Sequence, residues 1–247
     1  MRKERFKSFA NKDGPTQKRN MALLLNIDTS TEICSVALSE NGKIVALKEN
    51  KEGLNHSVLL GTYIDEILRE HQTNIRQLDA IAVSMGPGSY TGLRIGISMA
   101  KGLCFGAGKP MIAIPTLQAL AQSVSSRLPD NALYCPMIDA RRMEVYTAFF
   151  DRENREIVPT KATVIDSNTF ADLLSVHKIY FFGNGSEKVK TTLSAANACY
   201  IPNVTTSAAH LVHLSEQYYN EAKFVDVAYF EPFYLKDFIA TTPKKVL

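Results

Sequence analysis

The stretch LLLNIDTSTEICSVALSENGKIVAL, residues 23–47, decides the fold of this chain. Its apolar runs indicate three successive strands, at residues 23–28, 34–39 and 44–47. Asn41-Gly42 lies between the last two runs, and this dipeptide between apolar segments is a strong signal of a tight β-hairpin. We therefore expect the chain to open as three antiparallel strands.

The period of the apolar residues changes after Gly53, where they return every three or four positions as in an amphipathic helix. Helices are expected at residues 56–71, 91–105, 115–125, 167–175, 186–195 and 207–221. Further strands are expected at residues 80–84, 111–114, 134–138, 144–150, 161–164 and 178–182. Three strands, a helix, a strand and a glycine turn thus occur once in each half. This repetition predicts an α/β fold that arose by duplication, with two mixed-sheet domains.

The charge of the chain is unevenly distributed. Residues 1–20 hold seven basic residues against two acidic ones, a local charge of +5, so the remaining 227 residues sum to −2 within the net +3. The expected organisation is a disordered basic extension at 1–20, an N-terminal domain at 21–125, a C-terminal domain at 126–206, and a C-terminal helix and tail at 207–247 that pack back on the N-terminal domain. A transit peptide or an RNA-binding tail is the alternative for the extension, and the natural chain could begin at Met21.

Composition narrows the class of protein. No apolar run reaches the roughly 18 to 20 residues of a membrane helix. The four cysteines are widely spaced without a Cys-x-x-Cys pair, which favours buried thiols in a reducing, cytoplasmic compartment. His210 and His213 form a close pair, but no cysteine or carboxylate stands at ligand spacing beside them, so they indicate a surface helix and no metal is expected.

A glycine-rich segment, GPGSYTGLRIGISMAKGLCFGAGKP at residues 86–110, follows a predicted strand. It lacks the Gly-Lys-Ser/Thr ending of a P-loop, and its glycines miss the dinucleotide-binding spacing by one residue. Gly92, Gly96 and Ala100 lie on one helix face, although each interior glycine costs about 1 kcal/mol relative to alanine. Small residues in such a row admit a second backbone, either from the chain's own sheet or from a partner's helix.

Four stretches resemble the TsaB (YeaZ) family in the same order and spacing: NIDTS at 26–30, GPGSYTGLRIG at 86–96, DARRMEVY at 139–146, and Tyr234-Leu235. The similarity covers Met21 to about Lys245. It implies a duplicated ASKHA fold (actin, sugar kinase, heat-shock protein; RNase H-like). It also implies a role in forming threonylcarbamoyladenosine at position 37 of tRNAs that read codons beginning with A. The family member is a non-catalytic partner that dimerises with and activates TsaD, in a larger complex with the ATPase TsaE.

The same resemblance implies a homodimer when the chain is alone. Residues 21–247 lack a dense basic stripe with interleaved aromatic residues, so tRNA is expected to be contacted only indirectly, and the short apolar runs predict no membrane contact. The predicted partner-binding face consists of Leu59, Tyr63, Ile67, Gly92, Ile95, Gly96, Met99, Ala100 and Leu103.

The sequence departs from the catalytic relatives at two places. Their His-x-x-x-His pair holds a metal, and the matching positions here are Thr116 and Leu120, which cannot replace two imidazoles. Their Ser-Gly-Gly turn is replaced by residues 139–142, Asp-Ala-Arg-Arg, whose side chains stand where a phosphate would approach the backbone. We therefore expect no catalytic residue, no metal and no cofactor.

Two other groups of residues keep a ligand in question. Asp28, Thr29, Ser30, Gly183 and Gly185 resemble nucleotide-binding loops of the fold, although hydroxyls and carboxylates also satisfy a turn without any ligand. Arg141 and Arg142 could bind an anion as bidentate donors, or pair with Asp139, Glu144 or a partner's carboxylate.

Two alternative functions are weighed against the partner subunit. One is an ATP-binding transferase or kinase-like enzyme acting alone. The other is a peptidase using His56 with Ser57 or Ser89, although the Gly-x-Ser-x-Gly elbow of such enzymes is missing from the sequence.

Overall fold

The computed structural model describes residues 22–51, 53, 55–125, 129 and 131–235. The first half contains β1 (Leu23–Asp28), β2 (Cys34–Glu40), β3 (Lys43–Asn50), α1 (His56–Glu70), a 3-10 turn (Ile75–Gln77), β4 (Ala80–Gly86), α2 (Tyr90–Ala107), β5 (Met111–Pro115) and α3 (Thr116–Ser125). The second half contains β6 (Leu133–Asp139), β7 (Glu144–Phe150), β8 (Glu156–Val164), α4 (Ala171–Val176), β9 (Ile179–Phe182), a 3-10 turn (Glu187–Val189), β10 (Ala198–Tyr200) and α5 (Ala208–Asn220). The extension predicted at residues 1–20 lies outside the described residues.

The two halves have the same sheet topology. The strand order is β3-β2-β1-β4-β5 in one sheet and β8-β7-β6-β9-β10 in the other. In both, the first strand pairs antiparallel with the second and parallel with the fourth. This repetition confirms the predicted α/β fold built by duplication, with two mixed sheets.

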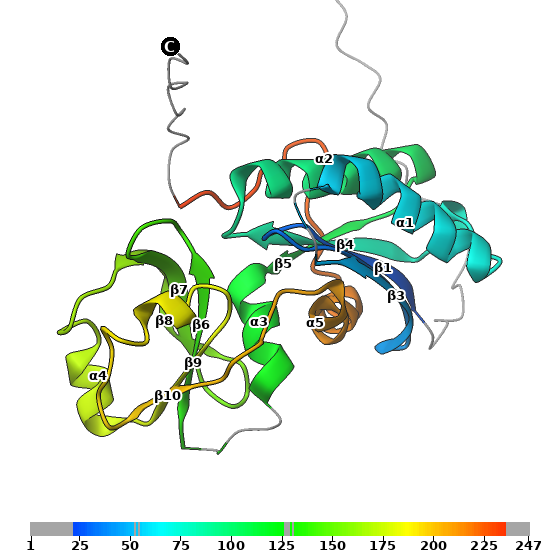
Figure 1. Cartoon of the computed structure of the whole chain (residues 1–247). Coiled ribbons are helices and arrows are strands. Elements are labelled where there is room, and N and C mark those ends of the chain that lie inside the picture. The colour runs from blue at the N-terminus through cyan, green and yellow to red at the C-terminus, as the bar shows by residue number, and fades with distance from the viewer. Residues whose placement is uncertain (1–21, 52, 54, 126–128, 130, 236–247) are drawn as a thin grey trace, which may run out of the picture.

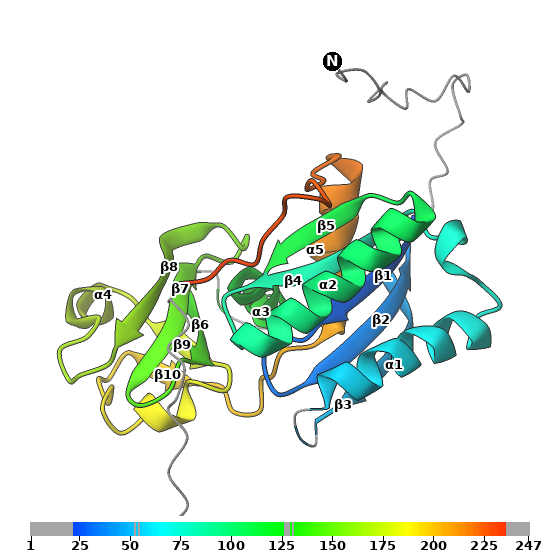
Figure 2. The same ribbon diagram turned by 90° about the horizontal axis from the view of Figure 1, so that it is seen from above.

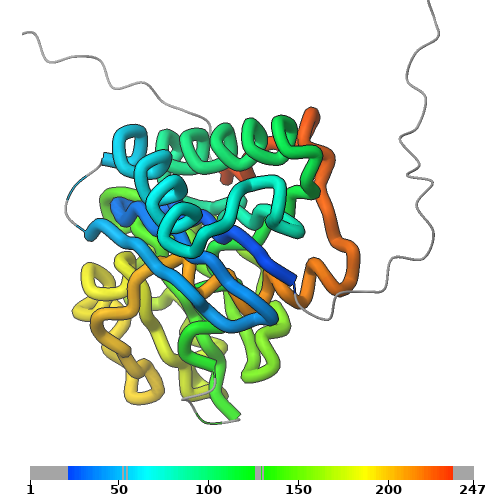
Figure 3. Tube along the Cα trace, turned by 90° about the vertical axis from the view of Figure 1, so that its right-hand side faces the viewer, coloured from blue at the N-terminus to red at the C-terminus, as the bar shows by residue number. Residues whose placement is uncertain are grey.

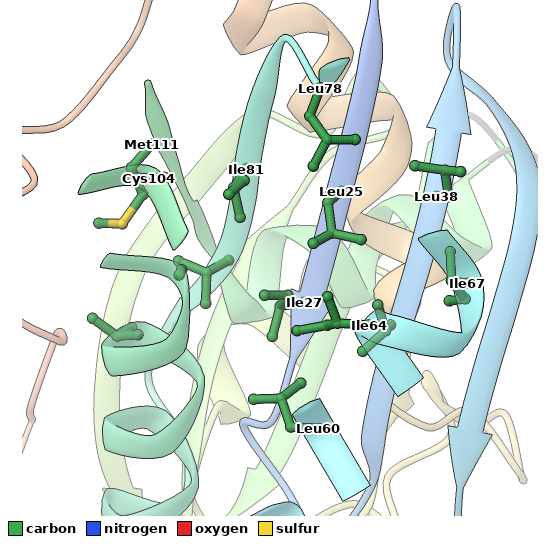
Figure 4. Packing of buried hydrophobic residues seen from close by; sticks show 14 of the residues in the cluster. Leu25, Ile27, Leu38, Leu60, Ile64, Ile67, Leu78, Ile81, Cys104 and Met111 are labelled. Carbon is green, nitrogen blue, oxygen red and sulfur yellow. The ribbon is translucent and has the colours of Figure 1, made fainter. Parts of the chain in front are cut away.

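The first sheet is covered by helices on both faces (Figure 1). Because side chains alternate along a strand, Leu25 and Ile27 of β1 point toward α1 and pack with Leu60 and Ile64 (Figure 4). Leu24, which precedes Leu25 and therefore points to the other side of the sheet, belongs to the cluster on the opposite face with Leu211 and Leu214 of α5. Helix α5 therefore returns to the first sheet although it follows the second in sequence.

Helix α3 lies between the two halves (Figure 1). Its Leu117 and Leu120 pack with Tyr134 and Ile138 of the second half. Ala119 belongs to the cluster on the first sheet. The helix is therefore buried on opposite sides, which fits its largely apolar sequence.

The second half differs from the sequence prediction at two helices. Asp166 binds the Asn168 backbone N–H and the Thr169 hydroxyl, and this local turn competes with helix, so α4 begins only at Ala171. The helix predicted at 186–195 is wrong, because the backbone forms a short 3-10 turn and then isolated turns around the buried Val189. Strand β10 was missed because three residues are too few to show alternation. Within the described part of the chain, no helix combines the length and the apolar character that crossing a bilayer requires.

Candidate functional site

The loops after β1 and β6 are the same turn built twice. Asp28 Oδ1 accepts a hydrogen bond from Ser30 N at 2.9 Å, and Asp139 Oδ1 accepts one from Arg141 N at 2.7 Å. The two halves meet here, where Asn184 Nδ2 donates to a carboxylate oxygen of Glu32 at 3.1 Å. The predicted nucleotide loops of the two halves therefore face each other across this junction.

The first loop is packed tightly against the start of α2. An ideal Cβ added to Gly92 would lie 2.1 Å from the Thr29 carbonyl oxygen, and one added to Gly88 would lie 2.2 Å from that of Ser30. Ser89 N donates to the Ser30 oxygen at 2.7 Å, and Thr29 Oγ1 donates to the Gly92 oxygen at 2.8 Å. The glycines of this segment admit the chain's own loop.

This packing corrects part of the predicted partner face. Gly92, Gly96 and Ala100 are buried, and an ideal Cβ on Gly96 would lie 2.2 Å from Thr29 Oγ1, so the row faces inward. Ile67 is buried as well. The partly buried members of the prediction, which edge the core below α1 and α2, are Leu59, Tyr63, Ile95, Met99 and Leu103. For these five residues, partner binding stays a prediction.

Asp28 is buried, and its Oδ1 atom accepts hydrogen bonds from groups of the chain itself. Ser30 Oγ and Ser84 Oγ donate to Oδ1 at 2.6 and 3.0 Å. Burial raises the pKa of the Asp28 carboxyl above its ordinary value, while these donors and the nearby His210 oppose the rise. Together with the internal bond of Thr29, this arrangement supports a structural turn at the first loop.

The Asp28→Asn substitution is expected to leave the chain at least as stable as wild type at neutral pH. Because the pKa is raised on folding, the contribution of the carboxyl is fully present below the unfolded pKa and is lost as the pH rises through the folded pKa. An isosteric amide can still accept the three hydrogen bonds and removes the buried charge. Urea unfolding between about pH 4 and pH 8 should show a smaller loss of stability with rising pH in the variant. A clear destabilisation at neutral pH would contradict this account.

The glycines of the second half serve packing of the same kind. An ideal Cβ on Gly183 would lie 2.3 Å from the Met137 carbonyl oxygen, and one on Gly185 would lie 3.0 Å from Asp139 N. Gly185 N also donates to the Met137 oxygen at 3.0 Å. The turn after β9 is therefore held closely against β6.

Arg141 and Arg142 are exposed at the tip of the β6–β7 connection, and both have left-handed backbone, with φ of 71° and 48°. Asp139 was one of the possible ion-pair partners of the two arginines. Its Oδ1 is instead bound by Lys188 Nζ, which also donates to the Glu144 carbonyl oxygen at 2.7 Å. Anion binding by the two arginines stays a prediction.

The positions that correspond to metal ligands in the catalytic relatives are both buried. Thr116 Oγ1 accepts a hydrogen bond from Gly86 N at 3.1 Å. Leu120 contacts the turn after β9, where its Cδ2 would lie 3.0 Å from a Cβ on Gly183. Both side chains therefore hold strand ends in place.

Two of the residues considered for peptidase chemistry, His56 and Ser89, have structural partners. The buried His56 contacts the Ile33 carbonyl oxygen through Nε2 at 3.2 Å. Ser89 caps α2, accepting a hydrogen bond from Gly92 N at 3.2 Å. His213 is exposed on α5, as the sequence predicted for a surface helix.

The outward side of α1 and α2, which lie side by side over the first sheet, carries residues that the sequence analysis missed (Figure 2). Phe105 is 86% exposed and Val58 is 69% exposed. Gly102 and Gly106 are exposed, and no atom of the described residues lies within 4 Å of a Cβ added at either. We call Val58, Gly102, Phe105 and Gly106, with the exposed Ser98, the outward face.

The repeated sheet order defines a protein of the duplicated ASKHA class. A family model described as "TsaD: tRNA N6-adenosine threonylcarbamoyltransferase" matches residues 50–244. The chain belongs to the TsaB (YeaZ) family. A Haemophilus influenzae protein named "tRNA threonylcarbamoyladenosine biosynthesis protein TsaB" is 32% identical over 229 residues, covering 87% of this chain and 93% of that relative.

Two further similarities agree with this family. The TsaB protein of Escherichia coli is 40% identical over 134 residues, which cover 54% of this chain and 57% of that relative. The solved structure of YeaZ from Pseudomonas aeruginosa is 27% identical with a TM-score of 0.75, and the match covers 87% of this chain and all of that one.

Proposed function

We propose that this chain is a non-catalytic subunit required for threonylcarbamoyl transfer to adenosine 37 of tRNAs that read codons beginning with A. It acts by dimerising with TsaD and activating it, and TsaE joins the larger complex. Membership of the TsaB family supports the pathway. The structural use of Thr116 and Leu120, where catalytic relatives have metal ligands, supports the non-catalytic role.

The observation that carries the partner role is the outward face. Gly102 costs helix stability of about 1 kcal/mol relative to alanine, and among the described residues nothing lies within 4 Å of a Cβ added at Gly102 or Gly106 to compensate. The inward row of α2 differs, because the space beside Gly92 is occupied by the Thr29 backbone. A second backbone packed on the outward face would supply the missing contact. The exposed Phe105 lies next to Gly106 in the same helix and would be buried with the glycines, and Val58 adds a second exposed apolar side chain on α1.

The same face serves a homodimer when TsaD is absent. The alternative, an ATP-binding enzyme acting alone, is less well supported because the first loop already packs against α2. The Thr29 hydroxyl donates to the Gly92 oxygen, the Ser30 carbonyl oxygen accepts from Ser89 N, and the Thr29 carbonyl oxygen lies close to Gly92. Calorimetry with ATP and magnesium discriminates between the two. Micromolar binding by the isolated chain that is lost in Asp28→Ala would favour the enzyme.

Reconstitution of tRNA modification tests the proposal directly. Purified TsaD, TsaE, the threonylcarbamoyl-adenylate synthase and tRNA are incubated with and without this chain, and modified adenosine is measured. We expect modification to fall to background without the chain and to return when it is added. Full modification by the other components alone would overturn the proposal.

A further inference from the structure

After α5, residues 222–235 form a segment that runs back along the first half, which we call the strap (Figure 3). Val225 N donates to the Met111 carbonyl oxygen at 3.0 Å, at the edge of β5. Lys101 Nζ of α2 donates to the carbonyl oxygens of Ala228 and Phe230 at 3.1 and 3.0 Å. The strap is thus fastened to β5 and to α2.

The strap reaches the start of α2 through a contact that requires glycine. Phe233 N donates to the Met85 carbonyl oxygen at 2.8 Å. The Phe233 carbonyl oxygen would lie 2.7 Å from a Cβ at Gly86, whose φ of +111° also suits only glycine. Gly86 therefore lets the strap place the next residue, Tyr234, beside α2.

Tyr234 fixes the guanidinium of Arg94. The rings of Tyr90 and Tyr234 lie 4.8 Å apart, and Arg94 Cζ lies 4.1 Å from the centre of the Tyr90 ring. Arg94 Nε donates to the Tyr234 hydroxyl at 3.0 Å. One face and one nitrogen of the guanidinium are therefore held by aromatic side chains, as in stacked arginine sites that recognise planar anions.

The terminal nitrogens of Arg94 remain available. The side chain is exposed, and among the described residues these nitrogens donate no hydrogen bond. Glu231 helps to raise the pKa of Arg94, after the larger effect of the Tyr234 hydrogen bond, but forms no ion pair with it in the described part of the chain. Two parallel N–H groups on a fixed plane match the two oxygens of a carboxylate.

The geometry points to Arg94 as a docking group for a carboxylate side chain of the protein that covers the outward face. Arg94, Ser98 and Gly102 follow at four-residue intervals on the exposed side of α2, so a protein packed on the outward face would also reach Arg94. The inference therefore rests on the proposed function. A monovalent anion fits better than a phosphate, because a phosphate would need further donors on the same helix. The Lys101 ammonium already donates to the strap, and Gly92 N already donates to Ser89 Oγ.

The affinity of the full chain for purified TsaD, measured by calorimetry, tests this inference. Arg94→Lys keeps the positive charge but loses the plane and the paired N–H groups, so we expect binding weaker by about tenfold or more. Tyr234→Phe keeps the ring and removes the hydroxyl, so a smaller loss of about two- to fivefold is expected. Arg155→Lys, at an exposed position between β7 and β8 of the second half, is the matched control and should bind as wild type.

The outcomes separate this inference from the proposed function. Wild-type affinity in Arg94→Lys, together with lost binding in Gly102→Arg, would overturn the role of Arg94 and leave the outward face intact. Unchanged affinity in both would overturn the proposed face as well. Inorganic phosphate is titrated into the isolated chain as a second arm. Binding of phosphate that disappears in Arg94→Lys would identify a phosphate site and overturn the carboxylate assignment.

Discussion

Gly92→Ala is expected to lower the free energy of unfolding by about 3 kcal/mol or more, a large fraction of the stability of a typical domain. The added Cβ would lie 2.1 Å from the Thr29 carbonyl oxygen, and a backbone atom cannot move aside as a flexible side chain can. Relief requires α2 and the loop after β1 to separate, which breaks the bond between Thr29 Oγ1 and the Gly92 oxygen. Urea unfolding followed by circular dichroism measures the change.

Gly102→Ala is the matched control on the same helix. In the described part of the chain nothing lies within 4 Å of a Cβ at Gly102, so the substitution should raise the free energy of unfolding by about 1 kcal/mol through helix propensity. Opposite signs at two glycines ten positions apart would establish which side of α2 faces the chain. Equal losses at both positions would contradict the orientation of the helix.

Much of the first half could be predicted because its signals are local. Asn41 and Gly42 have left-handed backbone, with φ of 54° and 69°, as the hairpin between β2 and β3 requires. The repeated order of strands and helices likewise predicted the two equivalent sheets. In the second half, Val189 and Leu193 are both buried and four positions apart, as in a helix, but a turn can bury the same residues, and the helix predicted at 186–195 does not form.

The orientation of α2 could not be predicted from its own sequence. The helix carries two rows of small residues, Gly92 to Ala100 and Ser98 to Gly106, both at four-residue spacing. The loop that fills the first row comes from Thr29, more than sixty positions earlier, so nothing within the helix distinguishes the two. The fixation of Arg94 by Tyr234 spans 140 positions and was equally hidden.

Gly102→Arg is expected to weaken association with TsaD by on the order of 100-fold without loss of folding. Gly102 is exposed and no described residue lies within 4 Å of a Cβ there, so we expect the new side chain to extend into solvent at little cost in the isolated chain. In a complex that brings a second backbone onto the outward face, it would either clash or bury an unpaired guanidinium, and both penalties fall on the bound state alone. Calorimetry with TsaD and sedimentation of the chain by itself measure the two associations.

The same introduced charge on the other half of the molecule separates a specific interface from a general effect. Ala171→Arg, at the exposed start of α4, should leave both associations unchanged. Because one face serves both partners, Gly102→Arg should convert a homodimer to a monomer as well as prevent binding to TsaD. If Gly102→Arg abolished only one of the two associations, the homodimer and the complex with TsaD would use different faces. If both associations were retained, the outward face would not be the binding surface.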